Sequence, residues 1–367
     1  MANETPVFVE RDPDVIMAES KAKLQELLGR ELQPAQVEQL MLQFIVYREV
    51  LLTNRFNAGM TQMLYQFSTA PVLDYIAGLV AVERLSAAEA GCTARFHLVP
   101  GHGHVLIPGG TRVATSDSAV IFSVADDIII TPSENSVDVE VVAEEAGKNG
   151  NGYLPGTVNK ILDPLAFVST VENITATAGG SDDETDAQLR ERIRLAPSQF
   201  STAGSRASYE YHARSANSTI IDISVTSPTP GVVLIVPLTE TGQAPEEVIR
   251  NINEACNAEN VRPLTDTVVV SSPSEVNYTI DVDLILYESA DADTTQAAVL
   301  AILTKFAEEK RKKLGKDIIR SHIAQMCRIA EVYDVTVNTP AENLVIADDE
   351  FASCTGVMVN ITGKNNG

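Results

Sequence analysis

The stretch GGSDDETDAQLRERIR, residues 179–194, marks the place where the chain changes from β-type to helical sequence. Ser181 can accept the backbone N–H three residues later, Glu184 can reach back to the serine, and the acids between them suit a helix N-terminus. Apolar residues at helical spacing continue this helix toward Pro197. Two glycines in front of a capped helix predict a junction between two differently folded regions.

The region before this junction, residues 91–178, alternates apolar and polar residues in short segments. Clusters of Gly, Pro, Asn and Asp separate these segments, as in a sheet of short strands joined by turns. The most turn-rich cluster is GKNGNGYLPG, residues 147–156, which predicts a surface loop. The strands that we expect in this small β domain are 94–99, 120–124, 128–131, 137–142 and 167–174.

The region after the junction alternates strands with helices. We expect helices at 205–216, 245–256, 293–314 and 317–329, and strands at 220–225, 232–236, 267–270, 276–286, 332–337 and 357–361. The basic run 310–313, followed by Gly315, is typical of a helix C-terminus, and we interpret it as a solvated helix end. Helices packed on sheets through βαβ-type units predict an α+β arrangement.

The first part of the chain, residues 14–84, has a helical pattern, with prolines near the starts of three helices. Apolar residues spaced by three or four positions form a stripe after Pro34. Its members are Val37, Leu40, Phe44, Tyr47 and Leu51, and after an offset of one residue the pattern resumes from Leu52 to Phe67. This predicts one helix of about 33 residues, which Asn57 and Gly59 can bend. The stripe packs either within the chain or in a bundle shared with a partner chain, and the pattern alone does not decide.

Together these patterns predict an α+β, multi-domain fold with long N-terminal helices, a small central β domain and C-terminal βαβ-type domains. We expect an N-terminal helical region at 1–90, a β-rich middle domain at 91–178, a helical connector at 179–218 and a C-terminal α+β region at 219–367. A length of 367 residues is in keeping with such a division.

The composition excludes several classes of function. Twenty-seven basic against 50 acidic residues give a net charge of −23, which disfavours binding to nucleic acid or to anionic lipids. The N-terminus has no secretory signal pattern, and no apolar run approaches the roughly 20 residues of a membrane span. The four cysteines have no CxxC spacing, which favours buried, reduced thiols in a protein that does not pass through the secretory route.

The search for catalytic or metal-binding motifs finds no convincing site. The glycines at 150–152 lack the context of a nucleotide-binding loop, and the SxxK-type match at 20–23 lacks its companion motifs. His97, His102 and His104 lack a further ligand at suitable spacing, so we interpret them as a solvated loop tip. The acidic run 182–186 lacks the order of a calcium loop. We therefore expect no catalytic, cofactor-binding or metal-binding residues, which favours a role in an assembly.

Several stretches in a fixed order resemble one protein family. They are IPGGTRVATSDSAVIF (107–122), AGKNGNGYLPGTVNKIL (146–162), GGSDDETDAQLRERIR (179–194), AGSRASYEYHARSA (203–216), RPLTDTVVVSSPSEVNYTIDVDL (262–284) and GKDIIRSHIAQMC (315–327). This series resembles the baseplate J-like proteins, the wedge components of contractile phage tails and related injection machines. The family more usually shows Gly-Thr where this chain has Gly204 and Ser205.

The resemblance implies a structural protein and not an enzyme, placed in the tail baseplate of a virion and assembled in the bacterial host cytoplasm. It implies that two copies pair through their C-terminal domains in each wedge, in a ring around the central hub or spike and close to sheath-proximal proteins. The N-terminal helices would join a bundle with another wedge protein through the stripe Val37, Leu40, Phe44, Tyr47 and Leu51. No cofactor, no nucleic acid and no membrane insertion are implied.

A mechanism follows from this resemblance as a hypothesis. Two copies in two environments need bendable joints between rigid domains. The loop 147–156 and the junction at Gly179 and Gly180 are the places where the backbone dihedrals can change at least cost. Receptor engagement would then tilt the wedges, widen the ring and release sheath contraction, and proline at both glycines should impair assembly or triggering. Two other classes stay open. A receptor-binding or fibre protein predicts a repetitive, β-rich trimer, and a cell-wall hydrolase predicts a pocket of converging carboxylates or histidines.

Overall fold

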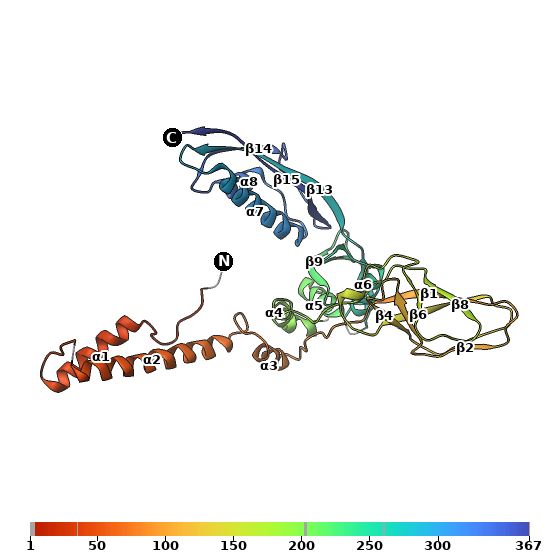
Figure 1. The fold of residues 1–367 in the computed structure, drawn as a ribbon, viewed down its shortest axis with the longest axis horizontal. Helices are drawn as coiled ribbons and strands as arrows, with labels where there is room; N and C mark the ends of the chain where they lie inside the picture. Colours follow the sequence, from red (N-terminus) through yellow and green to blue (C-terminus); the bar gives the residue numbers. More distant parts are fainter. Residues whose placement is uncertain (1–3, 35, 202–203, 260, 367) are drawn as a thin grey trace. The chain divides into compact units, whose positions relative to one another are not determined.

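The computed structural model describes residues 4–34, 36–201, 204–259 and 261–366, which form two compact units (Figure 1). The first unit comprises Met1–Arg84 and Thr185–Arg194, and the second comprises Leu85–Glu184 and Leu195–Gly367. The helices of the first unit are α1 (Pro13–Leu28), α2 (Val37–Gln62), α3 (Val72–Leu79) and most of α4 (Asp186–Leu195). Every strand of the described residues belongs to the second unit, and the mixture confirms the predicted α+β, multi-domain fold class.

Helices α1 and α2 pack against each other in the first unit. The Asp12 side chain caps α1 by accepting the N–H of Asp14, Pro13 occupies the first turn, and Gly29 ends the helix with a φ of +64°. The shared core is small and consists of Ile16, Leu32, Leu42 and Val46. Farther along the unit, Arg84 joins α3 to α4, because its guanidinium donates to Asp74 and to Asp186, each at 2.8 Å.

Helix α2 ends earlier than its sequence pattern predicts. It has 26 residues, and the expected helix of about 33 was wrong. The Gln62 side chain accepts the N–H of Thr69 at 2.8 Å and so holds the turn that follows the helix. Asn57 and Gly59 lie within the continuous helix, and the buried Asn57 side chain bonds the backbone of Phe8 and Val9 in the N-terminal segment.

A six-stranded antiparallel barrel sheet begins the second unit, in the strand order β7-β3-β4-β6-β1-β8. Its strands are β1 (Gly91–Leu98), β3 (Arg112–Thr115), β4 (Ile121–Val124), β6 (Ser136–Ala143), β7 (Val158–Ile161) and β8 (Val168–Asn173). Asn173 brings the end strands together, because its side chain accepts the N–H of Val158 and its carbonyl accepts the N–H of Gly156, both at 2.8 Å. The separate pair β2 (Val105–Ile107) and β5 (Ile128–Ile130) packs on the same core, which contains Phe96 and Phe122.

Acid should weaken this barrel through Asp163. Arg112 donates to this carboxylate from its guanidinium and from its backbone N–H, which lowers the pKa of Asp163 from 3.8 to about 2. A lowered pKa in the folded state means that the stabilisation is complete above pH 3.8 and is lost as the pH falls toward 2. In an NMR titration, Arg112→Ala should raise the pKa of Asp163 toward 3.8 and leave Asp138, which pairs with Arg95, unchanged. An unmoved Asp163 would contradict this assignment.

The central domain follows the barrel and is built on a four-stranded sheet. Strand β10 (Val232–Thr239) pairs antiparallel with β9 (Ile220–Thr226) and with β11 (Gly242–Gln243), and parallel with β12 (Thr267–Val270). Helix α6 (Glu246–Asn257) connects β11 to β12, and α5 (Arg206–Ala216) packs beside it. Ser205 caps α5 by accepting the N–H of Ser208, whereas Ala203, the first residue of the motif AGSRASYEYHARSA, lies outside the described residues.

The C-terminal domain covers one face of a three-stranded sheet with two helices (Figure 1). Strand β13 (Ser274–Tyr287) pairs antiparallel with β14 (Val332–Thr339) and parallel with the long β15 (Glu350–Asn365). Alternate residues of β13 are buried under α7 (Ala292–Arg311) and α8 (Arg320–Cys327), as a half-buried strand requires. None of the helices in the described part of the chain is both long and apolar enough to cross a membrane.

Asp222 joins the central domain to the C-terminal domain. Its carboxylate accepts the Leu314 N–H at 3.0 Å and lies 3.4 Å from Lys313 Nζ and 3.5 Å from Arg214 Nη2. A small apolar cluster completes this joint and contains Val236, Leu238, Leu314 and Phe351. The contacts explain why the central sheet and the C-terminal domain fall in one compact unit.

Asp222→Ala should loosen this joint. Removal of the carboxylate leaves the Leu314 N–H and Lys313 without this acceptor, while Arg214 keeps its pair with Glu210. This loss should cost about 2 kcal/mol of unfolding free energy. The matched control is Asp334→Ala, because the pair of Asp334 with Arg328 is exposed and 3.6 Å long; its effect should stay within about 0.5 kcal/mol. Thermal unfolding of both variants measures the difference, and equal effects would show that Asp222 does not hold the joint.

Candidate assembly surfaces

The predicted stripe on α2 lies on the surface of the first unit. Val37, Leu40, Phe44 and Tyr47 are 62%, 59%, 64% and 59% exposed, and Leu51 is partly buried. The side of α2 that packs against α1 is a different one, because it carries Leu42 and Val46. The pairing of α1 with α2 therefore leaves the stripe uncovered within the described residues.

A second apolar face runs along the same helix. At about 100° per residue, Leu52 is turned well away from Leu51, so the resumed pattern forms a new face and does not continue the stripe. This second face includes Met41, Ile45, Leu52 and Phe56, and Met63 at the C-cap extends it; all five are exposed. A helix that is apolar on nearly every side is typical of a bundle interior. The interpretation of one continuous stripe was wrong, because a straight helix cannot keep both halves on one side.

Gly179 and Gly180 lie in a network of backbone hydrogen bonds. Gly180 donates its N–H to the Asn151 side chain and accepts from the same side chain at its carbonyl, at 2.9 and 2.7 Å. On either side of the two glycines, Ala178 pairs with Gly91 and Ser181 pairs with Ala88 through isolated backbone bridges. Gly179 has a φ of +89°, which favours glycine, and a Cβ on Gly180 would lie 2.4 Å from the Gly147 carbonyl oxygen.

The loop 147–156 belongs to this network and is only partly a surface loop. Gly147 and Gly150 are buried, because the loop packs on Ala90 and on the segment before the glycine junction. The Gly147 N–H bonds the Ala88 carbonyl, and the Gly152 N–H bonds the Thr177 carbonyl, both at 2.9 Å. The prediction of a surface loop was therefore wrong for Gly147 and Gly150, whereas Lys148 and Asn149 between them are exposed.

The acids after the glycines accept backbone hydrogen bonds, and the predicted helix cap lies elsewhere. Asp183 accepts from the Ala87 N–H, Glu184 from the Leu85 N–H, and Asp182 from the Lys148 N–H. The residues that cap α4 are Thr185 and Gln188. The Gln188 side chain accepts the N–H and the hydroxyl of Thr185, and the Thr185 hydroxyl oxygen accepts the N–H of Gln188. The predicted box of Ser181 and Glu184 was wrong by four residues, although the same spacing occurs at Thr185 and Gln188.

The three histidines do not come together as a site. His102 is buried, and its two ring nitrogens lie 2.7 and 2.8 Å from the carbonyl oxygens of Gly103 and Glu134. His97 faces Glu172 at 3.5 Å. The interpretation as a solvated loop tip was wrong for His102, because its ring is buried between the Gly103 and Glu134 carbonyl groups of two turns. The described residues contain no group of three or more His, Cys, Asp or Glu side chains able to hold a metal ion.

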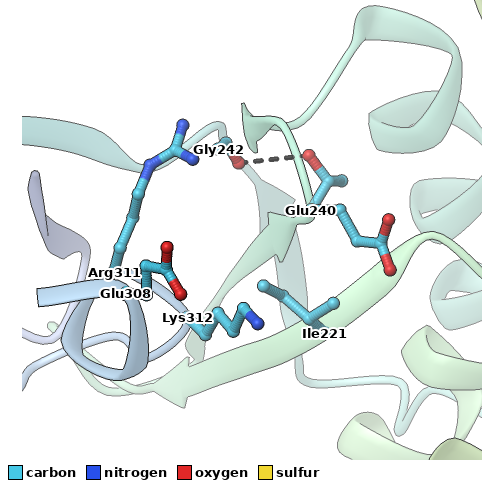
Figure 2. Close-up of a pocket in the computed structure, with 7 residues that line it drawn as sticks. Ile221, Glu240, Gly242, Glu308, Arg311 and Lys312 are labelled. Atoms are coloured by element: carbon cyan, nitrogen blue, oxygen red, sulfur yellow. Dashed lines mark hydrogen bonds between the residues drawn. The ribbon is translucent and has the colours of Figure 1, made fainter. Parts of the chain in front are cut away.

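The basic run 310–313 is more than a solvated helix end. Lys310 Nζ donates to the Asp317 carbonyl at 2.8 Å, and Arg311 donates to the Thr241 carbonyl at 3.3 Å. Arg311 and Lys312 line a pocket of about 60 Å³ together with Ile221, Glu240 and Gly242. In Figure 2, Lys312 extends toward Ile221 and Arg311 toward Gly242. This volume is well below the roughly 300–1,000 Å³ of ligand sites. The run therefore connects the end of α7 to the turn after β10.

The larger pocket beside the glycine junction has no evident catalytic group. Its volume is about 410 Å³, and the charged residues among its described lining are Lys148 and Glu240. Lys148 forms an ion pair with Asp182 at 2.9 Å.

Burial raises the pKa of Cys92 and of Cys327 to about 11 and that of Cys256 to about 12, so these thiols stay protonated and weakly nucleophilic at neutral pH.

Comparisons with known proteins point to one family along most of the chain. The baseplate J-like protein barrel domain matches residues 93–180, the baseplate J-like central domain matches residues 201–272, and the baseplate J-like protein C-terminal domain matches residues 278–360. Baseplate protein J of Escherichia phage P2 is 35% identical over 185 residues, which are 50% of this chain and 61% of that protein. The matched part thus spans about three fifths of the relative's length.

A solved structure is distantly similar to this chain. A chain in the cryo-EM structure of the anti-feeding prophage (AFP) baseplate, 6-fold symmetrised, has 12% sequence identity and a TM-score of 0.44, with 93% of this chain and 92% of that chain covered. The three consecutive domain matches decide the identification. This chain belongs to the baseplate J-like protein family.

Proposed function

We propose that the chain is a structural wedge protein of the baseplate of a contractile tail or injection machine, and that it has no catalytic activity. The observation that carries this proposal is the family match over barrel, central and C-terminal domains. The protein would occupy the tail baseplate after assembly in the host cytoplasm. It would relay receptor engagement at the periphery to contraction of the sheath.

The N-terminal helices would join a bundle with another wedge protein. The stripe Val37, Leu40, Phe44, Tyr47 and Leu51 supports this proposal, because α1 does not cover it. Large apolar side chains that stand exposed along one helix mark an interaction surface. The second apolar face of α2 offers room for a further helix in the same bundle.

Two copies of the chain would pair through their C-terminal regions and form a ring around the central hub or spike. Each copy would bend between its rigid domains at Gly179 and Gly180 to fit its own environment in the wedge, which stays a prediction. The double proline variant is a poor test of this hinge, because proline cannot adopt the φ of +89° at residue 179 and removes the N–H that Gly180 donates to Asn151. The single variant Gly180→Ala is a better test, because it can distinguish a hinge from a position that needs glycine only for close backbone packing.

Gold-labelled antibody imaging of particles from a producing lysate tests the proposed function. Label at one end of contractile tails, at the plate, would support the wedge role. Label at fibre tips would instead favour a receptor-binding protein. Protein that stays free, with no particle-associated label, would contradict the proposal, and an assay of the purified chain on peptidoglycan would then test the hydrolase alternative.

A further inference from the structure

Strand β9 leaves one edge of the central sheet open. It pairs with β10 and with no other strand of the described residues. A groove of about 360 Å³ runs along five consecutive residues of this strand, 222–226. An open strand edge beside a groove is the geometry in which a protein can accept one more strand from a partner.

The backbone groups that face this groove can be assigned from the sheet register. Ile235 of β10 lies opposite Val225, and its carbonyl accepts the Ser271 N–H beyond β12 at 3.1 Å. Ile235 therefore directs its N–H and C=O toward β12. Because opposed residues of an antiparallel pair exchange both hydrogen bonds or neither, Ile235 and Val225 exchange none. It follows that Val225, and Ile223 two residues before it, direct their N–H and C=O groups away from β10.

The side chains around the groove favour an acidic occupant. Arg206, Lys313 and Lys316 line it together with Asp222 and Asp348, so cations outnumber acids here in a chain of net charge −23. Arg206 and Lys316 are exposed and make no hydrogen bond or ion pair with any residue that the structure describes. Asp222, in contrast, is already occupied by Leu314, Lys313 and Arg214.

We propose that β9 accepts an extended, acidic segment of another baseplate protein as an added strand. The segment would bond the N–H and C=O groups of Ile223 and Val225. Its side chains would alternate, with apolar ones beside Ile223 and Val225, which contact the central core, and acidic ones beside Lys313 and Lys316. This inference rests on the proposed role in a baseplate.

Hydrogen exchange at single-residue resolution tests the proposal in purified tails and in the free protein. The amides of Ile223 and Val225 should exchange at least tenfold more slowly in tails, while the amide of Ser224, which faces β10, should be protected in both. Tails that contain the protein but leave Ile223 and Val225 unprotected would overturn this inference alone. Absence of the protein from tails would overturn the proposed function, and this inference with it.

Variants of the strand edge give a second measurement. Ile223→Pro removes an outward N–H and keeps the bonds to β10, so we expect folded protein whose incorporation into tails falls at least tenfold, whereas Ile223→Val should behave as the parent. Lys316→Glu should lower incorporation severalfold, and Lys305→Glu, which adds the same charge on exposed α7 surface, should not. Normal incorporation of Ile223→Pro would overturn the proposal. If that variant does not fold, the exchange comparison decides.

A photo-crosslinking side chain at Thr226 identifies the occupant. A crosslink to an acidic segment of another tail protein would support the proposal. A crosslink to a second copy of this chain would overturn the assignment to a partner protein.

Discussion

Phe44→Glu should abolish stable incorporation of the protein into baseplates while leaving the free chain folded. Phe44 is 64% exposed on the α2 stripe, so the substitution removes no packing from the unit itself. In a helix bundle the ring would be buried, and its loss together with the desolvation of a carboxylate should weaken the contact by about 100-fold or more. The readout is the fraction of tails that carry a plate when the variant is the sole copy produced.

The control for this prediction is Gln43→Glu, which adds the same charge one residue away. Residue 43 is exposed and lies about 100° around the helix from residue 44, at the polar edge of the stripe beside Leu40 and Tyr47, where a bundle contact is still open to water. We expect this variant to assemble normally, and both variants to melt within about 1 °C of the parent. Normal plates with Phe44→Glu would show that the stripe is not an interface, and failure of both variants would point to charge on α2 in general.

Periodicity predicted the elements that bury one face. In β13, alternate apolar residues from Tyr278 to Leu286 gave both the strand and its buried side, because a regular strand repeats every two residues. The same reasoning failed for β3 and β7, four residues each, since so short a segment contains too few repeats. It also failed to see that β15 extends over 16 residues, because its first half and its last residues have no alternation.

Side chains that bond distant backbone groups were the least predictable part of the site. The acids 182–184 look like helix-capping residues in the sequence, yet their partners are Leu85, Ala87 and Lys148, which lie far away along the chain. His102 similarly bonds the carbonyl of Glu134 across the barrel loops. Only the folded chain brings these groups together, so local spacing carries no signal for them.

The apolar surface of α2 was predictable in content but not in arrangement. The spacing of Val37, Leu40 and Phe44 marks a face, and the structure places that face outside the packing with α1. The offset between Leu51 and Leu52 was visible in the sequence and is itself the signal of two faces, because one residue turns the helix by about 100°.

Gly180→Ala should destabilise the second unit by about 2–3 kcal/mol. The new Cβ would lie 2.4 Å from the Gly147 carbonyl oxygen and 3.0 Å from both Ala90 Cβ and Asn151 Oδ1. The backbone cannot easily yield, because Gly147 is bonded to Ala88 and Gly180 is bonded twice to Asn151. A drop of roughly 5–10 °C in the melting temperature of the free protein is the expected result.

Gly103→Ala and Gly156→Ala are controls that separate the steric effect of an added Cβ from the backbone strain of a positive φ. A Cβ at Gly103 meets nothing within 4 Å, so that variant should stay within about 0.5 kcal/mol of the parent. Gly156 has the same open surroundings but a φ of +83°, so its alanine variant should show backbone strain alone, about 1 kcal/mol. If Gly180→Ala melts like the parent and still blocks triggering of assembled tails, the glycine serves as a hinge. If it melts as low as we expect, close backbone packing is sufficient reason for a glycine at this position.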